Sequence, residues 1–233
     1  MITRITPTLW QVRTFGFVNA WLVAQDDDTL TLVDTLTTRS APLLQRAAAA
    51  AGSTITRVVQ THGHVDHVGS TDALLDELPD RTEFIASTRE APLLAGDMTL
   101  QPGEGDTLKG GWTKLEHRPT RTVDDGDRIG SLRVIATPGH SPGHIALLDE
   151  RDGTLIGGDV FSNTWGFRTT SHVALRFPIV GIATQNPAQE LESARRLLSL
   201  EPTRLACGHG QVLEQPVQRM ADAIAHADER LAA

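Results

Sequence analysis

Four residues of the kinds that bind metal ions fall within six positions of this chain. They are His62, His64, Asp66 and His67, in a stretch that covers residues 61–70. Imidazole nitrogen suits zinc, iron and related ions, and carboxylate adds negative charge. In an extended segment alternate side chains share a face, so His62 and His64 can point the same way. Asp66 and His67 are adjacent and point elsewhere. The spacing therefore favours ligands for two neighbouring metal ions over a polar surface loop.

Short elements on either side must position these four donors. Residues 56–60 are predicted as a strand, and a helix is predicted over about residues 66–78, where Leu74, Leu75 and Leu78 have helical spacing. The donors thus lie on a turn from a strand to a helix.

Three more donors stand beside glycines at the ends of predicted strands. They are His140, Asp159 and His209, and the strands before them cover residues 132–136, 154–156 and 205–207. Glycine and proline form tight loops at such places. Loop formation explains the glycines but not the three donors, so these are also predicted metal ligands.

The H-x-H-x-D-H spacing and the later donors resemble the signature of metallo-β-lactamase-fold hydrolases, in their glyoxalase-II-like and lactonase-like branch. The resemblance spans positions 34–209. It implies an α/β (α+β) fold, a four-layer αββα sandwich with the site along one edge of two sheets. It also implies that His62, His64 and His140 bind one ion and that Asp66, His67 and His209 bind the second. Asp159 would bridge both.

The resemblance also implies the chemistry. The expected cofactors are two divalent ions per chain, zinc first, with manganese or iron as alternatives. Two ions about 3.5–4 Å apart can share a water molecule and lower its pKa toward about 7. The expected function is a dinuclear metal-dependent hydrolase, in which a metal-bridging hydroxide attacks a carboxylic ester, lactone or thioester. Asp66 is the expected catalytic residue and would accept a proton.

Substrate selection is assigned to two irregular stretches, residues 96–120 and 161–185. The second stretch begins just after Asp159 and holds five predicted substrate-binding residues, namely Phe161, Trp165, Phe167, Arg168 and His172. The aromatic side chains would form an apolar wall, with Arg168 or His172 at its rim. Core packing and a dimerisation surface are the alternatives for these aromatic residues.

Three residues beside the donors have other predicted roles. Asp34 ends a strand and could orient a ligand histidine through the ring nitrogen that does not bind metal; a strand-end turn is the alternative. His144 is expected to belong to its loop or strand. Cys207 is expected to be a small buried apolar residue.

The composition is that of an ordinary globular protein. With 233 residues, 39% hydrophobic and 21% charged, the chain is predicted to form a single domain over residues 1–233. It has one cysteine and no apolar run near 18 residues. Residues 1–7 lack the long apolar segment of a secretory signal, so no membrane span is expected and the expected location is the cytoplasm. The net charge of −8 argues against nucleic acid as a partner. A small-molecule substrate is expected, with a homodimer as a further candidate.

Other functions share the same resemblance. A persulfide dioxygenase would use this motif set with a single iron, and a phosphodiesterase or nuclease would use the same ligands on phosphodiesters. Known acyl-homoserine-lactone lactonases use a tyrosine near the metals, and this chain has no tyrosine. Glyoxalase II carries a further helical domain, whereas one predicted helix follows His209 here.

Overall fold

The computed structural model describes residues 1–173 and 178–232. The chain divides into two compact units. Unit 1 comprises residues 1–97 and 112–123, and unit 2 comprises the described residues of 98–111 and 124–233. Each unit contains one run of paired strands together with helices, as the predicted mixed α/β class requires. The prediction of a single domain stays a prediction.

Unit 1 is built on seven strands that pair in chain order. The first three pairings are antiparallel and the last three are parallel. The strands are β1 (Ile2–Arg4), β2 (Leu9–Thr14), β3 (Val18–Ala24), β4 (Leu30–Val33), β5 (Ile55–Val59), β6 (Glu83–Ser87) and β7 (Arg121–Val123). The parallel pairings need crossovers, which contain helices α1 (Ala41–Ala51), α2 (Val65–Val68), α3 (Thr71–Leu75) and α4 (Glu90–Leu94).

Helix α1 illustrates how unit 1 forms its core. Ala41, Leu44 and Ala48 lie on one face of α1 and are buried in the same cluster as strand residues such as Leu32 and Phe84. Gly52 ends the helix in the left-handed conformation, where its N–H reaches carbonyls of the last turn. Burying a side chain such as Leu44 stabilises the fold by about 1.5–3 kcal/mol.

The predicted continuous helix over residues 66–78 is wrong in its middle, because α2 and α3 are separate. The Ser70 hydroxyl donates to the Thr37 carbonyl and accepts from the Ser40 N–H, both at 2.7 Å. A Cβ on Gly69 would lie 2.6 Å from the backbone nitrogen of Thr38. The close approach of this loop therefore interrupts the helix directly after the donors.

Unit 2 has a sheet in the order β8-β9-β10-β11-β13, with β12 paired to β11 and β14 to β13. β11 and β13 are parallel, and the other pairings are antiparallel. The strands are β8 (Arg128–Ile129), β9 (Leu132–Ala136), β10 (Ile145–Asp149), β11 (Thr154–Asn163), β12 (Arg168–Thr169), β13 (Arg204–Gly210) and β14 (Leu213–Glu214). The helices are α5 (Pro178–Ala183), α6 (Pro187–Leu198) and α7 (Val217–Ala232).

Two strands of unit 2 are longer than predicted. Asp159 lies inside β11 and His209 inside β13, rather than after the strand ends. The β11–β13 register shifts on both sides of Gly158, whose φ is +50°. Such irregularities re-aim side chains without ending a strand. They explain why Gly157 and Gly158, which by sequence alone would follow the end of a strand, lie within β11.

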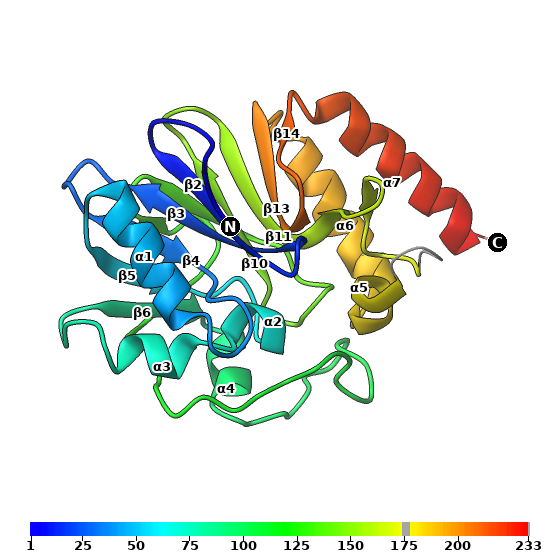
Figure 1. Cartoon of the computed structure of the whole chain (residues 1–233). Helices are drawn as coiled ribbons and strands as arrows, with labels where there is room; N and C mark the ends of the chain where they lie inside the picture. Colours follow the sequence, from blue (N-terminus) through cyan, green and yellow to red (C-terminus); the bar gives the residue numbers. More distant parts are fainter. Residues whose placement is uncertain (174–177, 233) are drawn as a thin grey trace. The chain divides into compact units, whose positions relative to one another are not determined.

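Helices α6 and α7 lie next to each other in unit 2 (Figure 1). Asn186 is the N-cap of α6 and accepts a hydrogen bond from the Gln189 N–H at 3.2 Å. Leu191 and Leu197 of α6 pack with Met220 and Ile224 of α7 in the core that also holds Phe161. Each of the two helices therefore buries one apolar face in this core.

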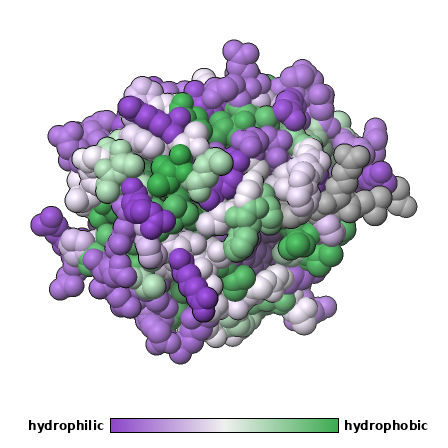
Figure 2. Space-filling model, in the orientation of Figure 1, coloured by the Kyte–Doolittle hydropathy of each residue, from purple (hydrophilic) through white to green (hydrophobic). Residues whose placement is uncertain are grey.

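Most exposed apolar side chains are scattered along the chain. Figure 2 shows hydrophilic residues over much of the face in view, with separate hydrophobic patches between them. Ile179 and Ile182 of α5 are among the most exposed large apolar residues. Among the described residues, each helix is too short or too polar to span a bilayer.

Candidate metal centre

Unit 1 gathers its four donors between β5 and α3. His62, His64 and His67 are buried, whereas the Asp66 side chain is 33% exposed. His62 Nε2 lies 3.1 Å from His64 Nδ1, and His67 Nε2 lies 3.9 Å from Asp66 Oδ2. The rings of His62 and His67 are 4.1 Å apart between centroids. All four predicted donors of this segment therefore lie together.

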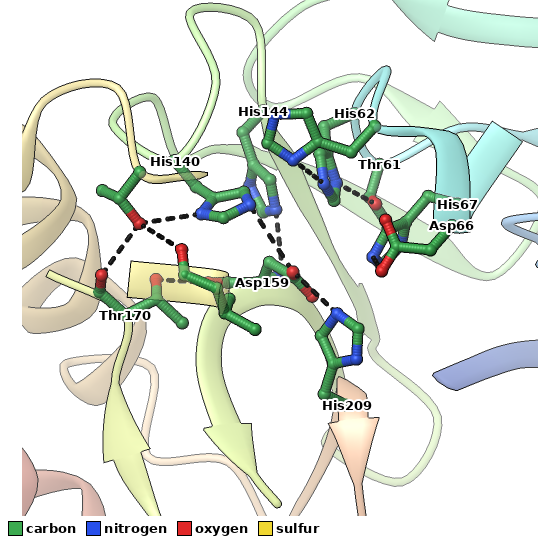
Figure 3. Close-up of polar contacts among 12 residues, drawn as sticks. Thr61, His62, Asp66, His67, His140, His144, Asp159, Thr170 and His209 are labelled. Carbon is green, nitrogen blue, oxygen red and sulfur yellow. Dashed lines mark hydrogen bonds and ion pairs between the residues drawn. The ribbon is translucent and has the colours of Figure 1, made fainter. Parts of the chain in front are cut away.

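Asp34 sets the orientation of two of these imidazoles. Its Oδ2 lies 2.7 Å from His67 Nδ1, and its carboxylate also accepts from the Thr61 hydroxyl. Because Thr61 Oγ1 donates to Asp34, it can accept from His62 Nδ1, which lies 3.0 Å away (Figure 3). Both rings then carry their hydrogen on Nδ1, which leaves Nε2 as the nitrogen that would bind a metal ion. The orienting role predicted for Asp34 matches these contacts.

Gly63 and Trp112 shape the same loop. His64 and Trp112 form an isolated β-bridge, and their rings are 5.1 Å apart between centroids. A Cβ on Gly63 would lie 2.5 Å from the Trp112 ring. Glycine is therefore required between the two histidines because the indole covers the loop.

In unit 2, two of the three predicted donors approach one carboxylate oxygen of the third. His140, Asp159 and His209 are all buried. His140 Nε2 lies 3.5 Å and His209 Nε2 lies 3.1 Å from Asp159 Oδ2 (Figure 3). Two imidazoles from different segments thus approach the same oxygen atom.

Hydrogen bonds also fix the other histidines of unit 2. His140 Nδ1 lies 3.0 Å from the Thr184 hydroxyl, which donates to the Thr170 carbonyl. Nε2 is consequently the nitrogen that His140 turns toward Asp159. His144 contacts Thr137 Oγ1 through Nδ1 at 2.8 Å and accepts the Asp159 N–H at Nε2. His144 therefore supports the backbone of Asp159, which agrees with its predicted place in the loop and strand.

Sequence reasoning missed two buried carboxyl groups. Glu190 Oε2 accepts the His140 N–H, and Glu90 Oε1 accepts the Gly63 N–H, both at 2.7 Å. Burial raises the pKa of Glu190 to about 8. The signal for Glu190 was its spacing of four from Ala194 and seven from Leu197, on the apolar face of α6. Cys207 is buried, as expected, and burial raises the pKa of its thiol.

The five predicted substrate-binding residues have different surroundings in unit 2. Phe161 lies in the hydrophobic core and stacks on Phe167 at 5.3 Å between centroids. Trp165 is 63% exposed. Arg168 donates to the Trp165 carbonyl, and the His172 ring contacts His226, which is outside the predicted set.

One pocket of unit 2 contains two of the predicted substrate-binding residues. Its volume is about 210 Å³, and its lining comprises Phe167, Arg168, Arg219, Asp222, Ala223 and His226. The Arg219 guanidinium lies over the Phe167 ring at 5.3 Å. An aromatic face and cationic groups therefore lie together in this pocket. The role of all five residues in substrate binding stays a prediction.

The donor set fits a metal in its chemistry. Buried imidazoles place Nε2 or Nδ1 close to other nitrogen and carboxylate atoms of the set. Two imidazole nitrogens lie beside the buried Asp159 carboxylate. Nitrogen and carboxylate ligands with hydrogen-bonded outer partners are typical of zinc and related ions. An ion would also balance the charge of the buried Asp34 and Asp159 carboxylates, which is expensive to bury alone.

Comparisons with known proteins agree with this chemistry. Residues 13–209 match the model of the metallo-β-lactamase superfamily. The uncharacterized protein YobT of Bacillus subtilis is 37% identical over 222 residues, which cover 93% of this chain and 94% of YobT. The probable metallo-hydrolase YqjP of the same organism is 30% identical, with coverage of 79% and 65% respectively.

Two further comparisons concern a relative that is named for its reaction and a solved structure that contains iron. A hydroxyacylglutathione hydrolase of Rhodospirillum rubrum is 33% identical over 117 residues, which cover 48% of this chain and 36% of that enzyme. The crystal structure of TTHA1623 in a di-iron-bound form has a TM-score of 0.64 and 25% identity, with coverage of 89% of this chain and 95% of that one.

Proposed function

We propose that this chain, which belongs to the metallo-β-lactamase superfamily and is a metal-dependent hydrolase, cleaves carboxylic esters, lactones or thioesters. It would use two divalent ions to do so. Membership follows from the family match over residues 13–209 and from the relative that is 37% identical. The hydrolase class follows from the family and from relatives named as metallo-hydrolases.

The observation that carries the dinuclear proposal is the convergence on Asp159 within unit 2. Two imidazole nitrogens lie 3.5 and 3.1 Å from one of its oxygens. A carboxylate that bridges two ions needs other ligands close to its oxygen atoms, as the two imidazoles are here. Unit 1 supplies His62, His64, Asp66 and His67 as proposed ligands, and unit 2 supplies His140, Asp159 and His209. A solved neighbour in a di-iron-bound form is consistent with this number of ions.

The ions would supply Lewis acidity and lower the pKa of water. The residues of the chain supply the rest. Asp34 holds His67, and Thr61 holds His62, so that each presents its Nε2. Asp66 is the most exposed carboxyl of the donor set and is proposed to accept a proton when the substrate bond breaks. Zinc is the first proposed ion, with manganese and iron as alternatives.

A carbonyl substrate is favoured over a phosphodiester polymer by charge. Each phosphate contact relies mainly on Lys or Arg, and the chain has 21 such residues against 29 acids. The name hydroxyacylglutathione hydrolase of one relative also points to an acyl substrate. An apolar portion of the substrate is proposed because Phe167 and Trp165 lie near the end of β11, the strand that carries Asp159.

The test compares kcat/KM at equal metal loading for a medium-chain lactone, a thioester and a bis-aryl phosphodiester. We expect a carbonyl substrate to be cleaved best. Cleavage of the phosphodiester ten times faster than of every carbonyl substrate would assign the chain to the phosphodiesterase or nuclease class. One iron per chain with oxygen consumption would assign it to the persulfide dioxygenases instead.

A further inference from the structure

Each unit contains one glutamate that is completely buried beside a ligand loop. Glu90 begins α4 in unit 1, and Glu190 lies in the first turn of α6 in unit 2. Both residues are 0% exposed. Burying a carboxyl group is expensive unless its oxygens are hydrogen-bonded. The partners of these oxygens therefore indicate what the two residues do.

Glu190 connects the segments that carry two proposed metal ligands. Its Oε2 accepts the backbone N–H of His140 at 2.7 Å. Its Oε1 lies 2.7 Å from the Thr170 hydroxyl, and that hydroxyl lies 2.6 Å from the backbone carbonyl oxygen of Asp159. The bridge from His140 through Glu190 and Thr170 to Asp159 runs entirely within unit 2.

The start of α6 also packs directly on the His140 loop. Gly139 has φ +139°, and a Cβ there would overlap the backbone of Glu190. The Asn186 N–H donates to the Gly139 carbonyl at 2.8 Å, and the Gln185 N–H donates to the His140 carbonyl at 3.1 Å. The loop and the first turn of the helix therefore form one fixed assembly around the Glu190 side chain.

The hydrogen count shows which side chain could replace Glu190. The Thr170 hydroxyl has one hydrogen, but it lies beside two oxygens, the Asp159 carbonyl oxygen and Glu190 Oε1. Because the carbonyl can only accept, the Thr170 hydrogen goes to Asp159. A hydrogen on Glu190 Oε1 can then be donated to the Thr170 oxygen, so that both contacts are hydrogen bonds. A glutamine would reproduce this pattern, because its amide oxygen can accept from His140 and its NH₂ can donate to Thr170.

Glu90 has the matching position in unit 1. Its Oε1 accepts the N–H of Gly63, which lies between His62 and His64. Its own N–H donates to the Ser87 hydroxyl at 3.0 Å, at the end of β6. A buried carboxyl group thus holds the backbone of a ligand loop in both units.

We propose that Glu190 is a positioning residue that holds the backbones of His140 and Asp159 in metal-binding geometry, and that Glu90 does the same for the His62–His64 loop. This inference rests on the proposed function, because it assumes that these residues bind metal. Neither glutamate is a metal ligand or touches substrate in this proposal; each acts through the loop it holds.

The test measures the zinc dissociation constant by competition with a chromophoric chelator, together with the thermal stability of the metal-free protein. Glu190→Ala is expected to weaken zinc binding by at least ~10-fold, the range found for partners of metal ligands. Glu190→Gln is expected to stay within about threefold of wild type, because it keeps both hydrogen bonds. Glu192→Ala, at an exposed position of the same helix, is the matched control.

Thr170→Val provides a second variant if Glu190→Ala does not fold. It preserves side-chain shape but breaks the connection to Asp159, so zinc binding should again weaken by ~10-fold or more. In unit 1, Glu90→Ala should likewise weaken zinc binding more than Glu90→Gln does. Wild-type zinc affinity in both Glu190→Ala and Thr170→Val would overturn the inference and leave the proposed function standing. Absence of zinc binding by the wild type would overturn both.

Discussion

At the residue scale, Asp34 connects the chemistry of unit 1 to its fold. Its carboxylate receives His67 Nδ1 together with the N–H and hydroxyl of Thr61. It also adopts a left-handed backbone conformation, with φ +62°. A non-glycine residue in that conformation is uncommon and is retained where the surrounding contacts require it.

Asp34→Ala should weaken zinc binding by ~10–100-fold, because two ligand histidines lose their orienting contacts. It should also destabilise the metal-free protein by about 1–3 kcal/mol, because buried donors lose their acceptor. Chelator competition and urea denaturation measure the two effects. Asp80→Ala, an exposed position in the same unit, is the control. Unchanged zinc affinity in Asp34→Ala would remove the orienting role.

Asp66→Ala and Asp159→Ala should each reduce turnover by at least ~100-fold, because both carboxylates are proposed ligands and Asp66 is also the proposed proton acceptor. Circular dichroism should show that both variants remain folded. Turnover is compared at verified metal content. Near-normal turnover in either variant would contradict its assigned role.

The metal-free protein should lose stability with rising pH through Glu190. Burial raises the pKa of this carboxyl to about 8 from 4.5, so the folded state holds the proton to higher pH than the unfolded state. The stabilisation is complete below pH 4.5 and is lost as pH rises to about 8, by at most about 1.4 kcal/mol per pH unit. Urea denaturation at pH 5, 6.5 and 8 should show wild type falling relative to Glu190→Gln. A relative gain by wild type would contradict the assignment.

At the element scale, the first turn of α6 and the loop before His140 depend on each other. Gly139→Ala should destabilise the protein by about 2 kcal/mol or more, because the new Cβ combines a left-handed conformation with overlap of the Glu190 backbone. Gly126→Ala is the matched control, since Gly126 has φ +86° but open space around it. Thermal denaturation of the metal-free variants measures both. Equal losses in the two variants would show that the overlap is relieved without cost.

The sequence predicted the local elements best where a short pattern determines them. The H-x-H-x-D-H spacing located four predicted donors on a turn into α2. The break after α2 depends on Ser70 contacting Thr37 and Ser40, which are distant in the chain and invisible to periodicity. The position of Asp159 inside β11 depends on its pairing with β13. The burial of Glu190 depends on the loop it contacts.

At the scale of the whole molecule, the fold class is confirmed by the family match and by the sheet and helices of each unit. Each unit has its own buried core, and the seven proposed ligands are divided between them. The orientation of the histidine side chains could not be read from the sequence, because it depends on Asp34 and Thr184, which are distant in the chain from the histidines that they contact. The family signature predicts which residues are the ligands, while the hydrogen bonds indicate which ring nitrogen His62, His67 and His140 present.

The number of metal ions per chain tests the central claim most directly. Native mass spectrometry of the wild type, with metal analysis of the same sample, should find two divalent ions per chain, because the proposal assigns seven ligands to the chain and the role of a bridge to Asp159. Asp159→Ala should hold fewer ions, and Asp80→Ala should match wild type. A wild-type protein that stays at one ion or none in excess zinc, manganese or iron would contradict the dinuclear account.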